Sequence, residues 1–293
     1  MIYTIKSGDI VAEINSYGAE LSSVKLAGTE LIWQSPSDEF WSKHAPLLFP
    51  VCGKLKDNAY TYKGKKYDMK GHGFISRCEF KPLSECEDTI TLYTESNEDT
   101  LKIYPFSFRF TIEYKATEKG ISSRARIENL GDCAMPYMFG WHPGFVLMCD
   151  ENADINDYRF TFENKPEFVT WSQLQHVSFI NPNKKAYKTT DGAYVFSEDE
   201  IYANDTMIFS NVGTRATLSS PKSSYKIDFE WSESTPHICI WKHPDNRTKF
   251  ICIEPWSSLP SDGEREEDFE VREMARLNPS DTEEFLFSFE FSL

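Results

Sequence analysis

The sequence is short of positive charge and contains no long apolar run. It has 31 Lys and Arg residues against 46 Asp and Glu residues, for a formal net charge of −15. Nucleic acid and anionic membranes are bound by basic surfaces that neutralise phosphates, so this composition argues against both partners. No stretch approaches the roughly 20 apolar residues that cross a bilayer, and no basic N-terminal segment leads into an apolar run. We therefore expect a soluble protein of the cytoplasm.

The cysteines are odd in number and show no CxxC spacing. Seven are present, at positions 52, 78, 86, 133, 149, 239 and 252. A disulfide framework uses an even set of cysteines in an oxidising compartment, and structural zinc sites use closely spaced pairs. We therefore predict free thiols in a reducing cytoplasm, with neither a disulfide frame nor a metal site.

Alternation of apolar and polar residues is the dominant pattern. Apolar side chains at every second position of 106–114 form one face of a strand, a turn follows at 117–120, and the alternation returns over 121–127. The same period of two recurs at 158–162, 225–231 and 285–291. Asn, Asp, Gly and Pro separate these short segments. The pattern predicts an all-β fold, a large antiparallel β-sandwich with few short helices.

One segment favours a helix instead. Residues 262–277 are rich in Glu, Arg, Met and Leu, and Asn278 and Pro279 would end a short helix there. No Ser/Gly linker, charge block or fixed-period repeat divides the chain. With 40% hydrophobic residues, a chain of 293 can build one large core, so we expect residues 1–293 to form a single domain.

Two of the six histidines lie where glycine and proline interrupt the strand rhythm. His72 stands between two glycines in KGHGF (70–74), and His142 stands in FGWHPGF (139–145). Such a break gives up strand pairing, and flanking glycines allow a ligand or another backbone to approach the ring closely. Either histidine alone also fits a structural role, as a buried imidazole with a satisfied hydrogen bond.

A third candidate is a carboxylate at the end of an apolar strand. Glu254 follows FICI (250–253) and precedes Pro255 and Trp256. A charged group in such a place must be paired or shifted in pKa, and clefts that perform acid–base chemistry collect such groups. The alternative is a glutamate that reaches solvent where its strand ends.

Four short motifs occur in order along nearly the whole chain. They are LFPVCGKLKD (48–57), GHGF (71–74), GWHP (140–143) and CIEPW (252–256). Together they resemble the aldose 1-epimerase (galactose mutarotase) superfamily, and within it the LacX-like branch. The resemblance implies a large antiparallel β-sandwich with a sugar cleft. It also implies a cofactor-independent isomerase that interconverts the α and β anomers of a hexose or related sugar, as a monomer or homodimer.

The resemblance assigns roles to individual residues. It implies that Glu254 is the general base, that His142 is the general acid, and that His72 contacts the ring-oxygen side of the sugar. Asp205, in YANDTMIF (202–209), resembles the aspartate that holds sugar hydroxyls, with an Asx turn before a strand as the alternative.

The match departs from the family pattern at Lys54, where the family usually has arginine. Lysine keeps the positive charge but lacks the planar bidentate fork, so Lys54 is either a sugar-binding residue of altered geometry or a solvated turn lysine. Tryptophans stack well on sugar faces, although most in a sandwich belong to the core. Trp141 and Trp256 adjoin the motifs and are the predicted substrate-binding ones among the candidates Trp33, Trp141, Trp241 and Trp256.

Anomer interconversion explains why a carboxylate and an imidazole are needed. A base removes the proton from O1 while an acid protonates the ring oxygen, so that the C1–O5 bond opens to the free aldehyde. Rotation about C1–C2 and reclosure, with the two roles reversed, give the other anomer. We expect the Glu254 carboxylate to help keep His142 protonated near neutral pH, against the effect of burial.

Three other functions fit parts of the pattern. A hexose-6-phosphate 1-epimerase needs basic residues around the phosphate, and Lys54, Lys56 and Arg77 are the candidates near the motifs. A non-catalytic carbohydrate-binding or sensing protein would retain the pocket, although the intact histidines and glutamate argue against it. A glycosidase would need a second acid beside Glu254, for which Asp205 is the candidate.

Overall fold

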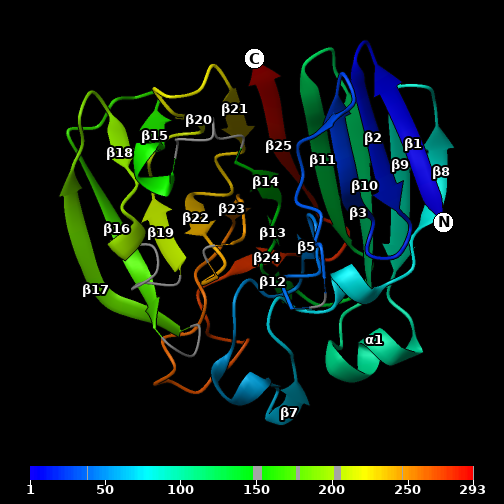
Figure 1. Cartoon of the computed structure of the whole chain (residues 1–293). Coiled ribbons are helices and arrows are strands. Elements are labelled where there is room, and N and C mark those ends of the chain that lie inside the picture. Colours follow the sequence, from blue (N-terminus) through cyan, green and yellow to red (C-terminus); the bar gives the residue numbers. More distant parts are fainter. Residues whose placement is uncertain (38, 148–153, 176–178, 201–205, 246, 293) are drawn as a thin grey trace.

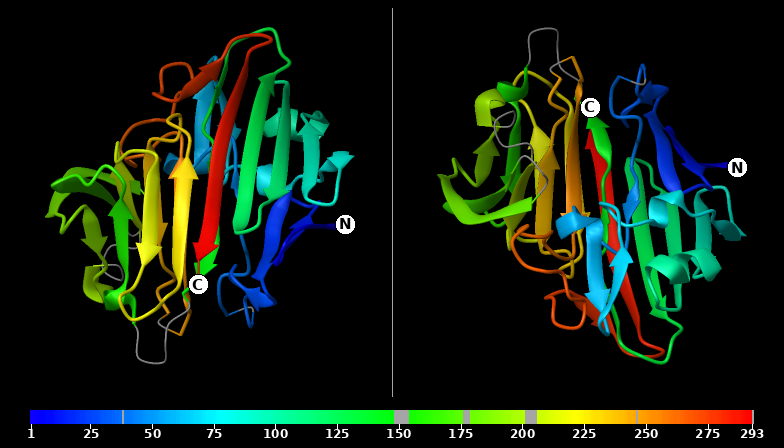
Figure 2. Two further views of the ribbon diagram at one scale, coloured as in Figure 1. Left: turned by 90° about the horizontal axis from the view of Figure 1, so that it is seen from above. Right: turned by 90° about the horizontal axis from the view of Figure 1, so that it is seen from below.

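Two large antiparallel sheets dominate the computed structural model, which describes residues 1–37, 39–147, 154–175, 179–200, 206–245 and 247–292 (Figure 1). The first is a nine-stranded sheet. Its strands, in spatial order, are β18 (Ala193–Val195), β15 (Arg159–Phe162), β20 (Arg215–Ser219), β21 (Lys226–Trp231), β25 (Thr282–Ser292), β11 (Gly120–Asn129), β10 (Phe108–Ala116), β9 (Thr89–Glu95) and β8 (Lys81–Glu85). Figure 2 shows β25, in red, running through the middle of this sheet.

The second large sheet carries the candidate site. Its strands, in spatial order, are β17 (Phe179–Lys188), β16 (Phe168–Gln175), β19 (Thr206–Ser210), β22 (His237–Trp241), β23 (Phe250–Trp256), β13 (Gly140–Trp141) and β5 (Leu47–Leu48), with β14 (Gly144–Val146) also paired to β23. Strand β23 lies in the interior of this sheet, and all seven of its residues are buried. A side chain on β23 is therefore shielded from solvent unless a cavity opens over it.

Smaller elements complete the fold. A four-stranded N-terminal sheet packs beside β9 and β10, where the Tyr114 hydroxyl donates to the Ala19 carbonyl at 2.9 Å. Two small two-stranded sheets and a few helical turns lie elsewhere. The elements are β1 (Ile2–Ser7), β2 (Ile10–Asn15), β3 (Glu20–Leu26), β4 (Thr29–Glu30), β6 (Ala59–Tyr62) with β7 (Lys65–Asp68), β12 (Met135–Tyr137) with β24 (Ala275–Leu277), α1 (Glu98–Ile103), and the 3₁₀ turns Lys56–Asn58, Ile75–Arg77 and Ile155–Asp157.

Aromatic side chains fill the space between the two large sheets. Along β25 the phenylalanines at every second position from 285 to 291 are buried, while Leu286 and Glu290 between them are exposed. Phe145 of β14 reaches across to Phe229 of β21 and Phe289 of β25, at ring-centroid distances of 5.1 and 5.0 Å. The β10–β11 hairpin has the predicted turn and the predicted buried face. The all-β sandwich read from the alternation is confirmed.

The helix predicted for residues 262–277 is absent. The segment forms turns and ends in the short strand β24. Asp262 and Asp268 accept hydrogen bonds from nearby backbone amides, a local arrangement that competes with helical bonding. Thr61 of β6 exchanges backbone hydrogen bonds with Glu267 and Phe269 at 2.7 and 2.9 Å. Pairing with a distant strand therefore overrides the helix propensity of this segment.

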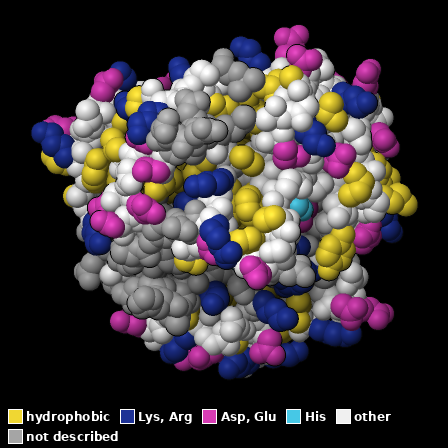
Figure 3. All heavy atoms as spheres, viewed as in Figure 1, with side chains coloured by type: hydrophobic (Ala, Val, Ile, Leu, Met, Phe, Trp, Pro, Cys, Tyr) yellow, Lys and Arg dark blue, Asp and Glu magenta, His cyan; other side chains and the backbone are white. Residues whose placement is uncertain are grey.

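The surface carries charges of both signs (Figure 3), and the described cysteines are free thiols. Figure 3 shows side chains of both charges interspersed over the face viewed. The six cysteines in the described ranges are free, while Cys149 lies outside them. None of the helices in the described part of the chain has the length and apolar composition needed to span a membrane.

Candidate active site

The histidines and the glutamate singled out by the sequence converge on one cavity of about 400 Å³. Its lining residues are Trp41, Gly53, Lys54, Gly71, His72, His142, Thr206, Trp241, Glu254 and Trp256. Trp141 is not among them, and Asp205 lies outside the described residues, next to the lining residue Thr206. A larger hollow of about 840 Å³ lies among the turns that follow β23, but its buried carboxylate, Glu267, is paired with Arg272 and not with an imidazole. The smaller cavity is therefore the candidate site.

Glu254 stands near the end of β23 and is 1% exposed. It faces Cys239 of β22 in the strand register. Burial raises the pKa of the Cys52, Cys239 and Cys252 thiols, and the negative charge of Glu254 raises each of them further. These thiols are therefore neutral, weakly polar neighbours of the carboxylate. Its Oε2 atom lies beside the His142 imidazole.

The broken strand around His142 aims its ring at that carboxylate. Gly140 pairs with Trp256 and Gly144 pairs with Cys252, and between them the strand is interrupted at His142 and Pro143, although Ile253 N still donates to the Pro143 carbonyl at 3.4 Å. A Cβ atom on Gly140 would lie 2.6 Å from the Trp256 ring, so only glycine allows this approach. The His142 Nε2 atom lies 3.4 Å from Glu254 Oε2, and its Nδ1 has no hydrogen-bond partner in the described part of the chain.

His72 lies beside the same pair, on the GHGF turn. Its backbone φ of 62° and that of Gly73, 70°, place the GHGF turn in the left-handed region. The Gly53 amide donates to His72 Nδ1 at 3.2 Å, so the neutral ring carries its proton on Nε2. The ring centroid lies 5.4 Å from that of His142 and 5.9 Å from that of Trp256. The turn thus supplies a second imidazole with a fixed tautomer.

Both imidazoles are shifted toward the neutral form. Burial, followed by the positive charge of Lys54, lowers the pKa of His72 to about 4. Burial, followed by the charge of His72, lowers the pKa of His142 well below its usual 6.5. This direction contradicts the expectation that Glu254 keeps His142 protonated near neutral pH, because burial disfavours the charged ring.

Lys54 is the basic residue that reaches the cavity among the three considered from the sequence. Its side chain is exposed and lines the wall beside Gly53. Lys56 instead pairs with Glu266 at 3.1 Å, and Arg77 donates to the Gly73 carbonyl at 2.5 Å. Neither lines the cavity. Among the described residues, the lining thus offers one Lys or Arg side chain, well short of the cluster that a phosphate group requires.

The aromatic walls differ in part from those predicted. Trp256 lines the cavity. The Trp141 ring packs in the sandwich core against Phe139 and Phe287, at ring-centroid distances of 4.5 and 5.6 Å. Trp141 therefore does not line the cavity, contrary to its predicted role in sugar stacking. Neighbouring side chains alternate across a strand, so Trp141 and His142 point to opposite sides. A place beside a motif residue identified Trp256 correctly but not Trp141, because it does not fix the face to which a side chain points.

Trp41 is a cavity residue that the sequence reasoning missed. Its ring stacks on His142 at 5.0 Å and meets Trp241 edge-on at 5.6 Å. It lies in a segment without strand rhythm, rich in Ser and Asp, where a large aromatic residue has no sheet to pack in. That isolation is the signal that could have identified it.

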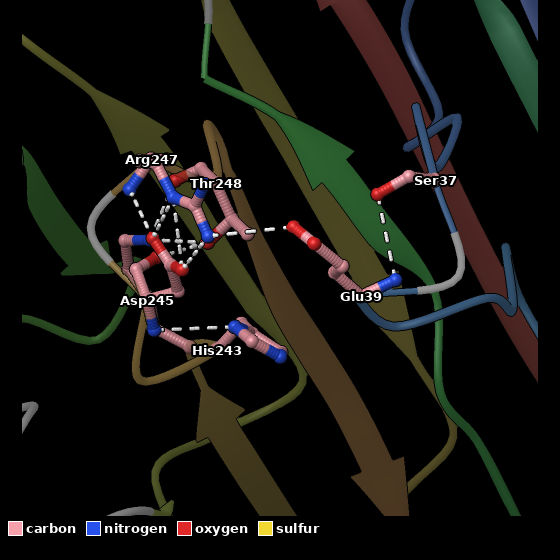
Figure 4. A network of polar contacts seen from close by, with 7 residues as sticks. Ser37, Glu39, His243, Asp245, Arg247 and Thr248 are labelled. Atoms are coloured by element: carbon pink, nitrogen blue, oxygen red, sulfur yellow. Dashed lines mark hydrogen bonds and ion pairs between the residues drawn. The ribbon is translucent and has the colours of Figure 1, made fainter.

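A polar network holds the loop that carries Trp41 (residues 39–44) against the turn between β22 and β23 (Figure 4). Arg247 contacts the carboxylates of Asp245 and Glu39 at 2.6 and 3.8 Å and lies over the Phe40 ring at 4.8 Å. On the buried side, the Trp33 indole donates to the Trp41 carbonyl at 2.8 Å. Each exposed contact is weak alone, but together they fix the loop that covers His142.

Comparisons with known proteins cover almost the whole chain. A family model described as aldose 1-epimerase matches residues 1–267. The plasmid-encoded protein LacX of Lactococcus lactis subsp. lactis is 26% identical over 298 residues, with 96% of each chain covered. The crystal structure of a galactose mutarotase related enzyme from Lactobacillus acidophilus is 29% identical with a TM-score of 0.91, covering 100% of this chain and 98% of that one. A galactose mutarotase-like protein from Lactobacillus casei is 26% identical with a TM-score of 0.92 and full coverage of both chains.

The GHGF turn provides a test of how His72 is positioned. A Cβ atom on Gly73 would lie 2.1 Å from the Phe49 carbonyl oxygen at a φ of 70°, whereas Gly64 has a φ of 71° with nothing within 4 Å. Gly73→Ala should therefore lower the free energy of unfolding by more than the roughly 1–2 kcal/mol expected from positive φ alone, the cost that the control Gly64→Ala reports. Urea unfolding measures both. Equal losses would show that the close approach to Phe49 is unimportant.

The low pKa of His72 predicts a loss of stability in acid. The folded state protonates His72 near pH 4, whereas the unfolded chain protonates it near 6.5. Between these values the unfolded state binds more protons, so the free energy of unfolding falls as the pH drops, by up to about 1.4 kcal/mol per pH unit from this group. His72→Asn should flatten that slope between pH 6.5 and 4 in urea unfolding. An unchanged slope would contradict the assignment.

Proposed function

Because the chain belongs to the aldose 1-epimerase family, we propose that it is a cofactor-independent isomerase that interconverts the α and β anomers of a free hexose or related sugar. The observation that carries the proposal is the pair formed by His142 and Glu254, 3.4 Å apart and both buried, at the wall of a cavity of about 400 Å³. Two proton-exchanging groups that face one small cavity suit a reaction in which two oxygens of one substrate exchange protons.

In ring opening, one member of the pair accepts a proton while the other donates one. The Glu254 carboxylate takes the proton from the O1 hydroxyl while His142 gives a proton to the ring oxygen, and the C1–O5 bond breaks to leave the open-chain aldehyde. After rotation about C1–C2, the O5 hydroxyl returns its proton to His142 and attacks C1, while Glu254 reprotonates O1. The enzyme ends in its starting protonation state. Each transfer requires the group to be within hydrogen-bond reach of its oxygen.

The remaining lining residues hold the sugar for these transfers. His72 carries its proton on Nε2 and donates to the ring-oxygen side, while Lys54 donates to a hydroxyl as a single point charge. Trp41, Trp241 and Trp256 offer apolar faces to the C–H groups of the ring. Asp205, which precedes Thr206, is proposed to accept from the sugar hydroxyls.

The same lining weighs against the other enzymatic functions. A phosphorylated sugar would present two negative charges, and the described lining residues offer Lys54 as their one basic side chain. A glycosidase requires two carboxyl groups, and Glu254 is the one carboxylate in the described lining. A binding protein would have no need for a buried acid–base pair at the cavity wall. These observations favour turnover of an unphosphorylated sugar.

Replacement of the base tests the proposal. Glu254→Gln keeps the size of the side chain but cannot accept a proton, so the turnover number for anomer interconversion should fall about 10²–10⁴-fold. Polarimetry on freshly dissolved α-anomer measures the rate. Glu267→Gln is the control, because Glu267 is a buried carboxylate that pairs with Arg272 outside the cavity and should affect stability alone. Turnover of Glu254→Gln within about threefold of wild type would refute the assignment.

The pH dependence distinguishes the two histidines. Activity requires a protonated acid and an ionised base together, so kcat/KM should be bell-shaped, with limbs that belong to the coupled pair. The pKa of His142 is lowered, so kcat/KM should fall with rising pH at a limb that lies below pH 6.5. His142→Asn should abolish that limb, whereas His72→Asn should lower the rate and leave both limbs.

This profile is measured in buffer containing a chelator, by polarimetry from about pH 4 to 9. If His72→Asn removes the limb at higher pH and His142→Asn leaves it, the roles of the two histidines are reversed. If neither variant changes the profile, the strand break around His142 is structural.

A further inference from the structure

We propose that the cleft also binds a divalent metal ion, with His142, Cys252 and Glu254 as ligands to Zn²⁺, and that the metal inhibits the isomerase. The inhibitory effect rests on the proposed function, whereas the metal site itself does not. Ligand atoms of these residues, one from each, all lie within 4.8 Å of one another. All three are buried, and two of them line the cavity through which an ion would enter.

The distances suit an ion at the centre of the group. Three atoms at most 4.8 Å apart share a centre no more than about 2.8 Å from each, so small side-chain shifts of roughly 0.5–0.8 Å give zinc bond lengths of about 2.0–2.3 Å. The separation of His142 Nε2 and Glu254 Oε2, 3.4 Å, already matches the distance of about 3.3–3.4 Å between two ligands of a tetrahedral ion with such bonds.

The sheet register brings the sulfur to the carboxylate. Cys252 and Glu254 are two residues apart on β23 and therefore point to the same face. Cys252 pairs with Gly144, two residues beyond His142, so the pairing of β14 with β23 holds the thiol and the imidazole close together. One nitrogen, one sulfur and one oxygen form a donor set that suits Zn²⁺ better than Mg²⁺ or Ca²⁺, which favour oxygen.

The charges balance when the ion binds. Zn²⁺ takes lone pairs from neutral His142 and from the Glu254 carboxylate, and it displaces the thiol proton of Cys252 to solvent. The thiolate and carboxylate then neutralise the two charges of the ion, and the fourth position faces the cavity. The formal net charge of −15 also favours the approach of cations.

The same geometry makes the ion an inhibitor. With Zn²⁺ bound, Glu254 can no longer take the O1 proton, and His142 Nε2 can no longer deliver one to the ring oxygen. Resident catalytic metals have histidine ligands whose second nitrogen donates to a fixed partner. His142 Nδ1 has no hydrogen-bond partner in the described ranges, which points to a reversible site without that support.

Cobalt spectroscopy tests the metal site independently of any activity. Chelator-treated protein is titrated with Co²⁺, and a sulfur-to-cobalt charge-transfer band in the near ultraviolet, displaced by Zn²⁺, is expected. Cys252→Ser and Cys252→Ala should abolish the band and weaken Zn²⁺ binding at least tenfold. Cys239→Ser is the matched control, since Cys239 is an equally buried thiol that faces Glu254 from β22 and should leave the band intact.

The outcomes separate the two proposals. No charge-transfer band in the folded wild type, or a band that survives both Cys252 variants, overturns the metal site. A band with inhibition of anomer interconversion by Zn²⁺, reversed by chelator, supports the whole inference. A band without any measurable interconversion supports the metal site and contradicts the proposed function. Circular dichroism identifies a Cys252 variant that fails to fold, in which case the other one decides.

Discussion

The burial of one carboxylate inside a sheet is the constraint on which the site depends. Glu254 lies on an interior strand with 1% of its surface exposed, where an isolated charge would be costly. The carboxylate therefore needs a partner. The segment that pairs with β23 is interrupted at His142 and Pro143, and His142 is that partner. Pairing with β23 resumes at Gly144, and the His142 amide still donates to the Pro46 carbonyl at 3.0 Å. Little backbone hydrogen bonding is therefore lost where the imidazole is presented.

Burial also sets the balance of charge within the cavity. Loss of hydration lowers the pKa of both histidines, and Lys54 adds to this effect at His72. A neutral imidazole beside a carboxylate is a weak proton donor at rest but a strong acid once protonated, and it is also a good metal ligand. The aromatic cover formed by Trp41 and Trp241 strengthens these interactions by keeping water away from the pair. The proposed catalysis and the proposed metal inhibition would both follow from this one arrangement.

Much of the fold and the centre of the site were predictable from the sequence, because both depend on local pattern. Period-two alternation predicted the strands, and glycine and proline in that alternation marked the two histidines. The rest depends on partners distant in the chain. Residues 262–277 form turns because β6 pairs with them, and Trp141 faces the core because of the sheet to which it belongs. Neither the protonation of His142 nor the proximity of Cys252 to it can be read from spacing along the chain.

The most direct test of the central claim is exchange NMR on a sugar labelled with ¹³C at C1, in D₂O with chelator. Enzymatic anomer interconversion predicts cross-peaks between the α and β anomeric carbons that appear with wild-type enzyme at mixing times too short for spontaneous exchange. No carbon-bound hydrogen should be replaced by deuterium, because only O–H protons move. Deuterium at a ring carbon, or α–β exchange no faster than without enzyme across a panel of free sugars, would contradict the account.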